Sequence, residues 1–218
     1  MTKTIKQLLT EAGVPDYQPQ ANRVQITRRP LYCRRNINGT QADKATVDFF
    51  HKGVGDDMAY FGGTAGTAAN RLQTNLQPEG RLAEGELFIC LGVAFQLPHD
   101  ISITHANLLH ETTVSWVENA ETVRKQLGQF EDFPAQVRLD YIIEDQVSSN
   151  VTTATQRLVR SVGRAGMGDS PLFYIRGGVS KHDAGKLQLE FHQSSAFGTT
   201  GPVVKAKLYG LFFQKLGA

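Results

Sequence analysis

The residues of this chain best suited to chemistry are histidines gathered in a short stretch. His99, His105 and His110 fall within thirteen residues together with Asp100 and Glu111, and imidazole and carboxylate groups are common zinc ligands. A site on one strand face needs His-x-His, and a site on one helix face needs histidines four residues apart. Because His105 and His110 are five residues apart, solvated or capping histidines are the preferred interpretation. A metal site is the alternative.

Two adjacent carboxylate pairs could in principle supply general acid and base groups. They are Asp56-Asp57 and Glu131-Asp132. Neighbouring side chains point apart on a strand, and glycosidase pairs depend on a separation in space that spacing alone does not give. Solvated loop charge is therefore the preferred interpretation of both pairs.

Nucleophile and phosphate-binding motifs are also weak. The chain has no Gly-x-Ser-x-Gly elbow, and Ser194-Ser195 lies in the polar loop HQSSAFGTTG. The glycine-rich segment 61–70, FGGTAGTAAN, lacks the Lys-Ser/Thr ending of a nucleotide-binding loop. A flexible tip or an interface loop is predicted there, and no catalytic residue or cofactor is expected.

The strongest charge feature is a group of five arginines within thirteen residues, with Tyr32 among them. The group consists of Arg23, Arg28, Arg29, Arg34 and Arg35. Fixed cations at this density can neutralise phosphates of nucleic acid or of lipid head groups. The more ordinary interpretation is that these arginines form salt bridges to neighbouring subunits or a solvated strand face. The sequence alone favours this interpretation over phosphate binding.

The composition is that of a globular protein. The chain has 218 residues, 40% of them hydrophobic and 20% charged, with a formal net charge of +2. A charge this small predicts no global attraction to nucleic acid or membranes, and no apolar run is long enough for a spanning helix. The N-terminal residues do not resemble a secretion signal. Cys33 and Cys90 are therefore expected to be reduced, buried thiols rather than a disulfide.

The elements that must carry these side chains are mainly strands. Residues 87–95, between Gly85 and Pro98, form a near-continuous apolar run, which predicts a strand buried on both faces. Residues 203–213 alternate, with Val204, Ala206, Leu208 and Phe212 on one side and Lys205, Lys207 and Tyr209 on the other. The patterns also predict shorter strands at 46–50, 114–117, 137–143, 155–162, 171–175 and 187–191, and a strand pattern within 23–35.

Two helices are predicted. Residues 4–13 place Ile5, Leu8 and Leu9 at helical spacing. Residues 119–130 begin with an asparagine that can cap a helix, and their apolar residues share one helical face. The predicted organisation is an N-terminal arm, 1–22, followed by one domain, 23–218. Its fold class is all-β, a single jelly-roll β-sandwich with an N-terminal helical arm and one or two short helices in loops.

The order of several short motifs resembles a known family. The strand Val47-Asp48-Phe49-Phe50 precedes the Gly/Ala/Thr loop. Thr74-Asn75-Leu76 and a turn with Gly80, Leu82 and Gly85 then lead into residues 86–89, and the chain closes with Leu208-Tyr209-Gly210-Leu211-Phe212-Phe213. This succession, over residues 46–97 and 203–216, resembles the jelly-roll major capsid proteins of tailless icosahedral bacteriophages, whose jelly rolls stand upright in the shell. Ala83 and Glu84 stand where that family often has proline.

The resemblance implies a structural virion protein and not an enzyme. At this length the chain would be a member with one jelly roll, self-assembling in the host cytoplasm into the capsomers and shell lattice of the virion. The arm would lace to neighbouring copies or face an internal membrane. Arg28, Arg29, Arg34 and Arg35 are the expected contacts to packaged nucleic acid or lipid head groups, and other virion proteins are further expected partners.

Two alternatives from other classes stay open. A carbohydrate-binding β-sandwich module would use Trp116 and the tyrosines as stacking platforms. A metal-dependent β-barrel enzyme would use His99, His105 and His110, and would bind metal stoichiometrically.

Overall fold

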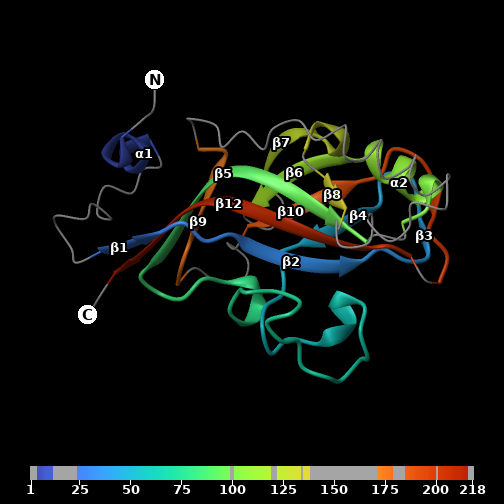
Figure 1. Cartoon of the computed structure of the whole chain (residues 1–218), viewed down its shortest axis with the longest axis horizontal. Helices are drawn as coiled ribbons and strands as arrows, with labels where there is room; N and C mark the ends of the chain where they lie inside the picture. Colours follow the sequence, from blue (N-terminus) through green and yellow to red (C-terminus); the bar gives the residue numbers. More distant parts are fainter. Residues whose placement is uncertain are drawn as a thin grey trace, which may run out of the picture.

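The fold is built around β5 (Glu86–Leu97) and β12 (Val203–Lys215), which pair antiparallel along most of their length. A computed structural model describes residues 4–11, 24–98, 101–118, 122–133, 135–137, 171–178, 185–199 and 201–215. Figure 1 shows β5 and β12 running side by side through the middle of the molecule. The strand predicted at 203–213 is confirmed, and it lies inside a sheet, with β5 on one side and β1 and β2 on the other.

The other strands of this first sheet pair with one or other of the central strands. β1 (Val24–Thr27) and β2 (Leu31–Asn36) pair successively with β12, and β9 (Phe173–Arg176) pairs antiparallel with β5. β8 (Ala135–Val137) pairs parallel with β5. The order across the sheet is therefore β1 or β2, then β12, then β5, then β8 or β9.

A second sheet has the order β4-β10-β6-β7, and all its pairings are antiparallel. Its strands are β4 (Thr46–Phe49), β10 (Lys186–Glu190), β6 (Thr113–Glu118) and β7 (Val123–Gln129). A short ribbon of β3 (Thr40–Gln41) and β11 (Ser195–Ala196) completes the strands. The structure is thus mostly antiparallel β-sheet, in agreement with the predicted all-β sandwich.

The core lies between the two sheets and is rich in aromatic rings. Phe95 on β5 stacks on Phe130 with ring centroids 4.4 Å apart, and it contacts Phe49 of β4 edge to face. Trp116 of β6 stacks on Phe173 of β9 at 3.9 Å. Rings from both sheets therefore meet in the same core, and such ring pairs add specific geometry to the area that they bury.

The predicted double burial of β5 is confirmed, and so is the alternation of β12. Phe88, Cys90, Val93 and Phe95 belong to the core between the sheets, while Leu87 and Ile89 belong to a smaller apolar cluster on the other side.

The register between β5 and β12 shifts at Tyr209/Gly210, where β5 holds one extra residue. A bulge of this kind changes which side chains face each way along one strand.

The helix α1 (Ile5–Glu11) covers that smaller cluster. Leu8 and Leu9 are buried against a patch on β5 and β12 consisting of Leu87, Ile89, Leu211 and Phe213. The predicted N-terminal helix is confirmed, and its seven residues fit the expectation that a helix too short to be stable alone must dock. The arm's remaining residues, 1–3 and 12–22, lie outside the described ranges.

The second predicted helix is wrong. Residues 123–129 of the predicted 119–130 helix are the edge strand β7, and the turn η5 (Phe130–Asp132) follows. β7 pairs with β6, so partners from another strand override a local pattern that suited a helix. The second α-helix is instead α2 (Ile103–His110), capped by the Ser102 hydroxyl, which accepts from the His105 N–H at 3.1 Å.

The glycine-rich loop between β4 and β5 is built against the sandwich. The turns η2 (Met58–Phe61) and η3 (Pro78–Gly80) lie in it, and Phe61 and Ala69 are buried in the core. The segment 61–70, predicted as a flexible tip or an interface loop, therefore contributes Phe61 and Ala69 to the core, while its glycines and threonines are exposed. No helix in the described part of the chain is long and apolar enough to cross a bilayer. Of the strand predicted at 137–143, Val137 is the last residue of β8, and residues 138–143 lie outside the described ranges, as does the strand predicted at 155–162.

Candidate interaction surfaces

The predicted arginine group divides between the two faces of β2. Arg34 is exposed on the outer face, while Arg35, the next residue, faces the loop that carries η2. Successive side chains of a strand point to opposite faces, so arginines adjacent in sequence cannot share one surface. Arg28 is exposed before β2, and Arg23 lies outside the described residues.

Arg35 and Arg29 make contacts of a structural kind. The Arg35 guanidinium lies 3.9 Å over the Tyr60 ring and donates to the Tyr60 carbonyl, while its buried Nε has no hydrogen-bond partner among the described residues. The Tyr60 hydroxyl donates to the Asp48 carbonyl at 2.6 Å, and burial raises the pKa of Tyr60 well above 10.0. Arg29 lies 3.6 Å over Phe212, with Glu86 3.9 Å away. These two arginines secure the loop and the end of the sheet.

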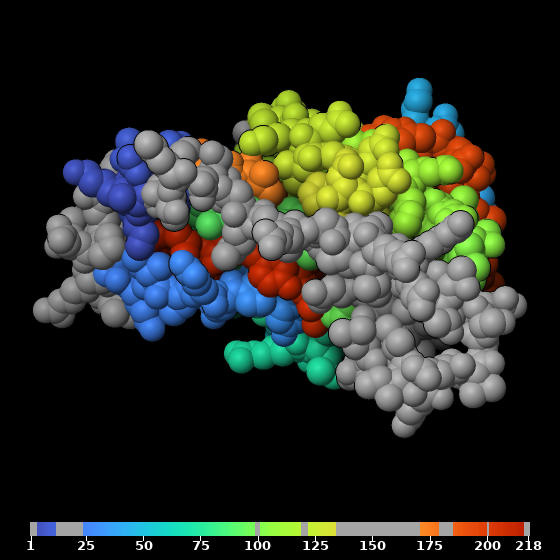
Figure 2. Space-filling view, turned by 45° about the horizontal axis from the view of Figure 1, so that its top comes forward, coloured from blue at the N-terminus to red at the C-terminus, as the bar shows by residue number. Residues whose placement is uncertain are grey.

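Arg34 joins cations that lie far away in the sequence. It is directly opposite Lys205 in the β2–β12 register, and Lys207 lies two residues along β12 on the same face. Tyr32 is opposite Lys207, with the Lys205 Nζ 4.1 Å over its ring, and Tyr209 follows on the same face. We call Tyr32, Arg34, Lys205, Lys207 and Tyr209 the basic face. In Figure 2, red atoms of β12 lie at the surface beside blue atoms of the β1–β2 segment.

The prediction of shared orientation along β12 was right, but sequence reasoning missed this surface. Only the pairing of β12 with β2 brings Arg34 to Lys205. A signal was present in both segments, because each strand carries cations and tyrosine at every second position. The pairing partner of a strand, however, cannot be predicted from its own alternation.

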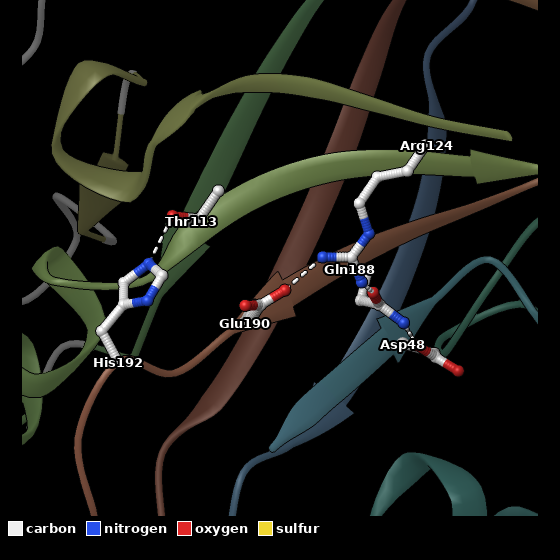
Figure 3. A network of polar contacts seen from close by, with 6 residues as sticks. All are labelled: Asp48, Thr113, Arg124, Gln188, Glu190 and His192. Carbon is white, nitrogen blue, oxygen red and sulfur yellow. Dashed lines mark hydrogen bonds and ion pairs between the residues drawn. The ribbon is translucent and has the colours of Figure 1, made fainter. Parts of the chain in front are cut away.

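The outer face of the second sheet carries charge of both signs, arranged in a network (Figure 3). Lys186 Nζ and Asp48 Oδ2 are 2.8 Å apart, and the Gln188 amide donates to Asp48 Oδ1 at 2.9 Å. Arg124 of β7 donates to both Gln188 and Glu190 on β10. The contacts reach from β4 through β10 to β7. We call Asp48, Arg124, Lys186, Gln188 and Glu190 the paired face.

The histidines do not form a metal site among the described residues. His105 and His110 lie on α2, next to Phe197 and Phe130 respectively, and His99 falls outside the described residues. Burial lowers the pKa of His110, against the opposing effect of Glu131. In the part of the chain that the structure describes, no three His, Cys, Asp or Glu side chains are placed to hold a metal ion.

The other chemical candidates serve local structure. Asp56 Oδ2 accepts from the N–H groups of Gly53 and Glu79, each at 2.7 Å, and Asp57 caps η2. These carboxylates cap turns of the loop, and Asp57 is exposed, in agreement with the predicted solvated loop charge. Trp116 is 2% exposed and stacks inside the core, so it is not a stacking platform for a sugar.

Both cysteines are free and buried, as predicted. Burial raises the pKa of the Cys33 thiol to about 12 and raises that of Cys90 as well. Thiols held protonated in this way are poor nucleophiles, because the thiolate is the reactive form. Cys33 and Cys90 therefore fill space in the core.

Comparisons with protein-family models, with curated proteins and with solved structures found no match.

Proposed function

We propose that this chain is a jelly-roll shell subunit, the self-assembling major capsid protein of an icosahedral virus, specifically a bacteriophage. The observation that carries the proposal is the strand order. β2-β12-β5-β9 faces β4-β10-β6-β7, and along these eight strands every link except the β6–β7 hairpin passes from one sheet to the other; β8 is an additional strand of the first sheet, between β7 and β9 in the chain. Eight strands in this order support a jelly roll, an architecture frequent in viral capsids and also found in lectins and cupins.

The residues that carry the family resemblance support the proposal because their roles in the fold are specific. The Asn75 side chain accepts from the Tyr32 N–H at 2.9 Å and donates to the Pro30 carbonyl at 2.8 Å, which fastens this segment to β2. A Cβ at Gly210 would lie 1.9 Å from the Ile89 carbonyl oxygen, so the closing motif needs glycine where β12 meets β5. Motifs that build a scaffold suit a structural protein better than an enzyme.

The N-terminal arm supplies a route to self-assembly. Its helix α1 contributes Leu8 and Leu9 to the patch of Leu87, Ile89, Leu211 and Phe213. A neighbouring copy presents the same patch, so an arm could exchange between copies without any new contact chemistry. Such lacing is the role proposed for residues 1–22, with an internal membrane as the other surface that the arm could meet.

The carbohydrate-binding alternative loses its main stacking platform, because Trp116 is buried in the core.

The proposed shell function implies that the protein is located in the virion and is assembled in the host cytoplasm. Its partners would be copies of itself and other virion proteins. The packaged nucleic acid or an internal membrane would be a further partner.

The test is the mass of the purified full-length chain by sedimentation, together with negative-stain images. Rings, sheets or closed particles are expected. The matched variants are Leu9→Asp, which should weaken assembly by preventing α1 from docking, and Ile5→Asp on the exposed side of α1, which should assemble like the wild type. A wild-type chain that stays monomeric at all concentrations would rule out the proposal.

A further inference from the structure

The three cations of the basic face form no ion pair with a carboxylate of the described residues. Arg34 and Lys205 are cross-strand partners, and Lys207 lies beside them. Among the described residues, the ion pairs join Arg29 to Glu86, Arg81 to Glu79, Arg124 to Glu190 and Lys186 to Asp48. None of these pairs includes a cation of the basic face.

This arrangement works against folding. Like charges directly opposite each other on paired strands destabilise a sheet. Burial, and then the charges of Lys207 and Arg34, lower the pKa of Lys205. On the other sheet the cations are neutralised within the chain, because Arg124 pairs with Glu190 and Lys186 pairs with Asp48. Because no carboxylate of the described residues neutralises this charge, the basic face suits a partner of opposite charge.

Two aromatic rings are interleaved with the cations. Tyr32 lies under the Lys205 ammonium, and its hydroxyl donates to the Arg71 carbonyl, which fixes the ring. Tyr209 lies two residues beyond Lys207, opposite Gly92, which has no side chain. Cations and rings alternating on a rigid sheet are the combination that single-stranded nucleic acid uses, with phosphates on the cations and bases on the rings.

We propose that the basic face binds single-stranded nucleic acid through Arg34, Lys205 and Lys207. This inference rests on the proposed shell function, for which it names a residue-level contact to the packaged genome. It replaces the predicted set Arg28, Arg29, Arg34 and Arg35, of which only Arg34 belongs to the surface. Nucleic acid is favoured over a lipid surface because the rings interleaved with the cations suit stacking on bases, whereas an amphipathic membrane-binding surface also inserts apolar side chains. The exposed large apolar residues in the described ranges are Ile5, Leu72, Ile103, Val123 and Tyr174, and none lies on β2 or β12.

The experiment measures binding of a fluorescent oligothymidylate of about 20 nucleotides by anisotropy, between about 50 and 200 mM salt. Neutralising three phosphates of a single strand gives a slope of log K against log salt of about −2, which is roughly a 20-fold loss over this range. The triple variant Arg34→Gln, Lys205→Gln, Lys207→Gln should remove that slope and weaken binding at low salt at least about 10-fold.

A matched control removes three cations elsewhere. Lys6→Gln, Lys44→Gln and Lys52→Gln make the same change in net charge and leave the basic face intact, so binding should stay near wild type. Arg34→Glu alone is a second variant that should also abolish binding. Thermal unfolding of every variant establishes that each is folded.

Several outcomes overturn the inference: no binding by the wild type, equal losses in the triple variant and its control, or binding to phosphatidylserine vesicles without binding to the oligonucleotide. Negative-stain images of the same samples separate this result from the proposed function. Particles that form without oligonucleotide binding reject the inference alone, whereas a protein that binds the oligonucleotide but never assembles rejects the shell function alone.

Discussion

The outer faces of the two sheets differ in how their charged side chains are paired. On the paired face, Arg124 contacts Glu190 and Lys186 contacts Asp48. On the basic face, Arg34 is opposite Lys205, and neither has an ion-pair partner among the carboxylates that the structure describes. Both faces belong to one sandwich and use the same kinds of strand. The difference therefore comes from which residues the register places opposite each other.

The contrast between the two faces indicates where an anionic partner would bind. A network whose donors and acceptors satisfy one another contributes to the stability of the isolated chain. A group of like charges subtracts from that stability and becomes favourable only when an anion arrives. The paired face is accordingly a part of the fold, and the basic face is a surface for binding. Substitutions on the two faces should shift stability in opposite directions.

The largest effect is expected at Asp48 on the paired face. Asp48→Ala removes the acceptor of both Lys186 and Gln188, and Gln188 is 1% exposed. A buried amide that loses its acceptor costs about 1–3 kcal/mol, so the free energy of unfolding should fall by about that amount. The measurement is urea unfolding of unassembled protein, followed through the single, buried Trp116.

Thr46→Ala is the control for that prediction, because Thr46 lies two residues earlier on β4 and is exposed. Its effect should stay within about 0.5 kcal/mol. If Asp48→Ala costs no more than this control, the network does not stabilise the chain, and the contrast between the two faces disappears.

A smaller effect of opposite sign is expected on the basic face. Arg34→Glu turns a like-charge cross-strand pair with Lys205 into an opposite-charge pair, so the free energy of unfolding should rise by about 0.5–1.5 kcal/mol. Arg34→Gln removes the repulsion without adding an attraction and should give a value between those of the wild type and Arg34→Glu. The same urea titration measures all three. Equal or lower stability of Arg34→Glu would show that Arg34 and Lys205 do not repel each other appreciably.

The sequence predicted best where one strand contains its own signal. The double burial of β5 follows from the apolar run, and the alternation of β12 follows from period-two spacing, because both depend on each strand's own residues. The helix predicted over 119–130 failed for the converse reason. Val123 and Leu127 suit a helix face, but β6 offers them a pairing edge, and this long-range contact is not encoded in the segment itself.

The candidate surfaces show the same limit more sharply. The prediction grouped Arg34 with Arg35 because they are neighbours in sequence, whereas the strand sends them to opposite faces. Alternation within β2 was enough to separate these two arginines. The addition of Lys205 and Lys207 required the β2–β12 register, which joins segments about 170 residues apart and has no local signature.

The smallest expected effect is a pH dependence that belongs to Lys205. Its pKa lies below the ordinary 10.5 in the folded protein, through burial and then through the charges of Lys207 and Arg34. Between the lowered pKa and 10.5 the folded chain binds fewer protons than the unfolded chain, so this residue's contribution to stability rises with pH across that window. At lower pH, where Lys205 is charged in both states, its full penalty is present.

The check compares the free energy of unfolding of wild type and Lys205→Gln, measured with urea from neutral pH upward. Relative to the variant, the wild type should become more stable as the pH approaches 10.5. The buried groups Cys33, Cys90 and Tyr60, whose pKa values are raised, make stability fall with rising pH, but they are common to both proteins and cancel in the difference. Arg34→Gln should reduce the gain, because it removes one of the two cations acting on Lys205. A difference that does not change with pH would mean that the ring of Tyr32 compensates the ammonium for its neighbours. In that case the basic face would carry no stored repulsion for an anion to relieve.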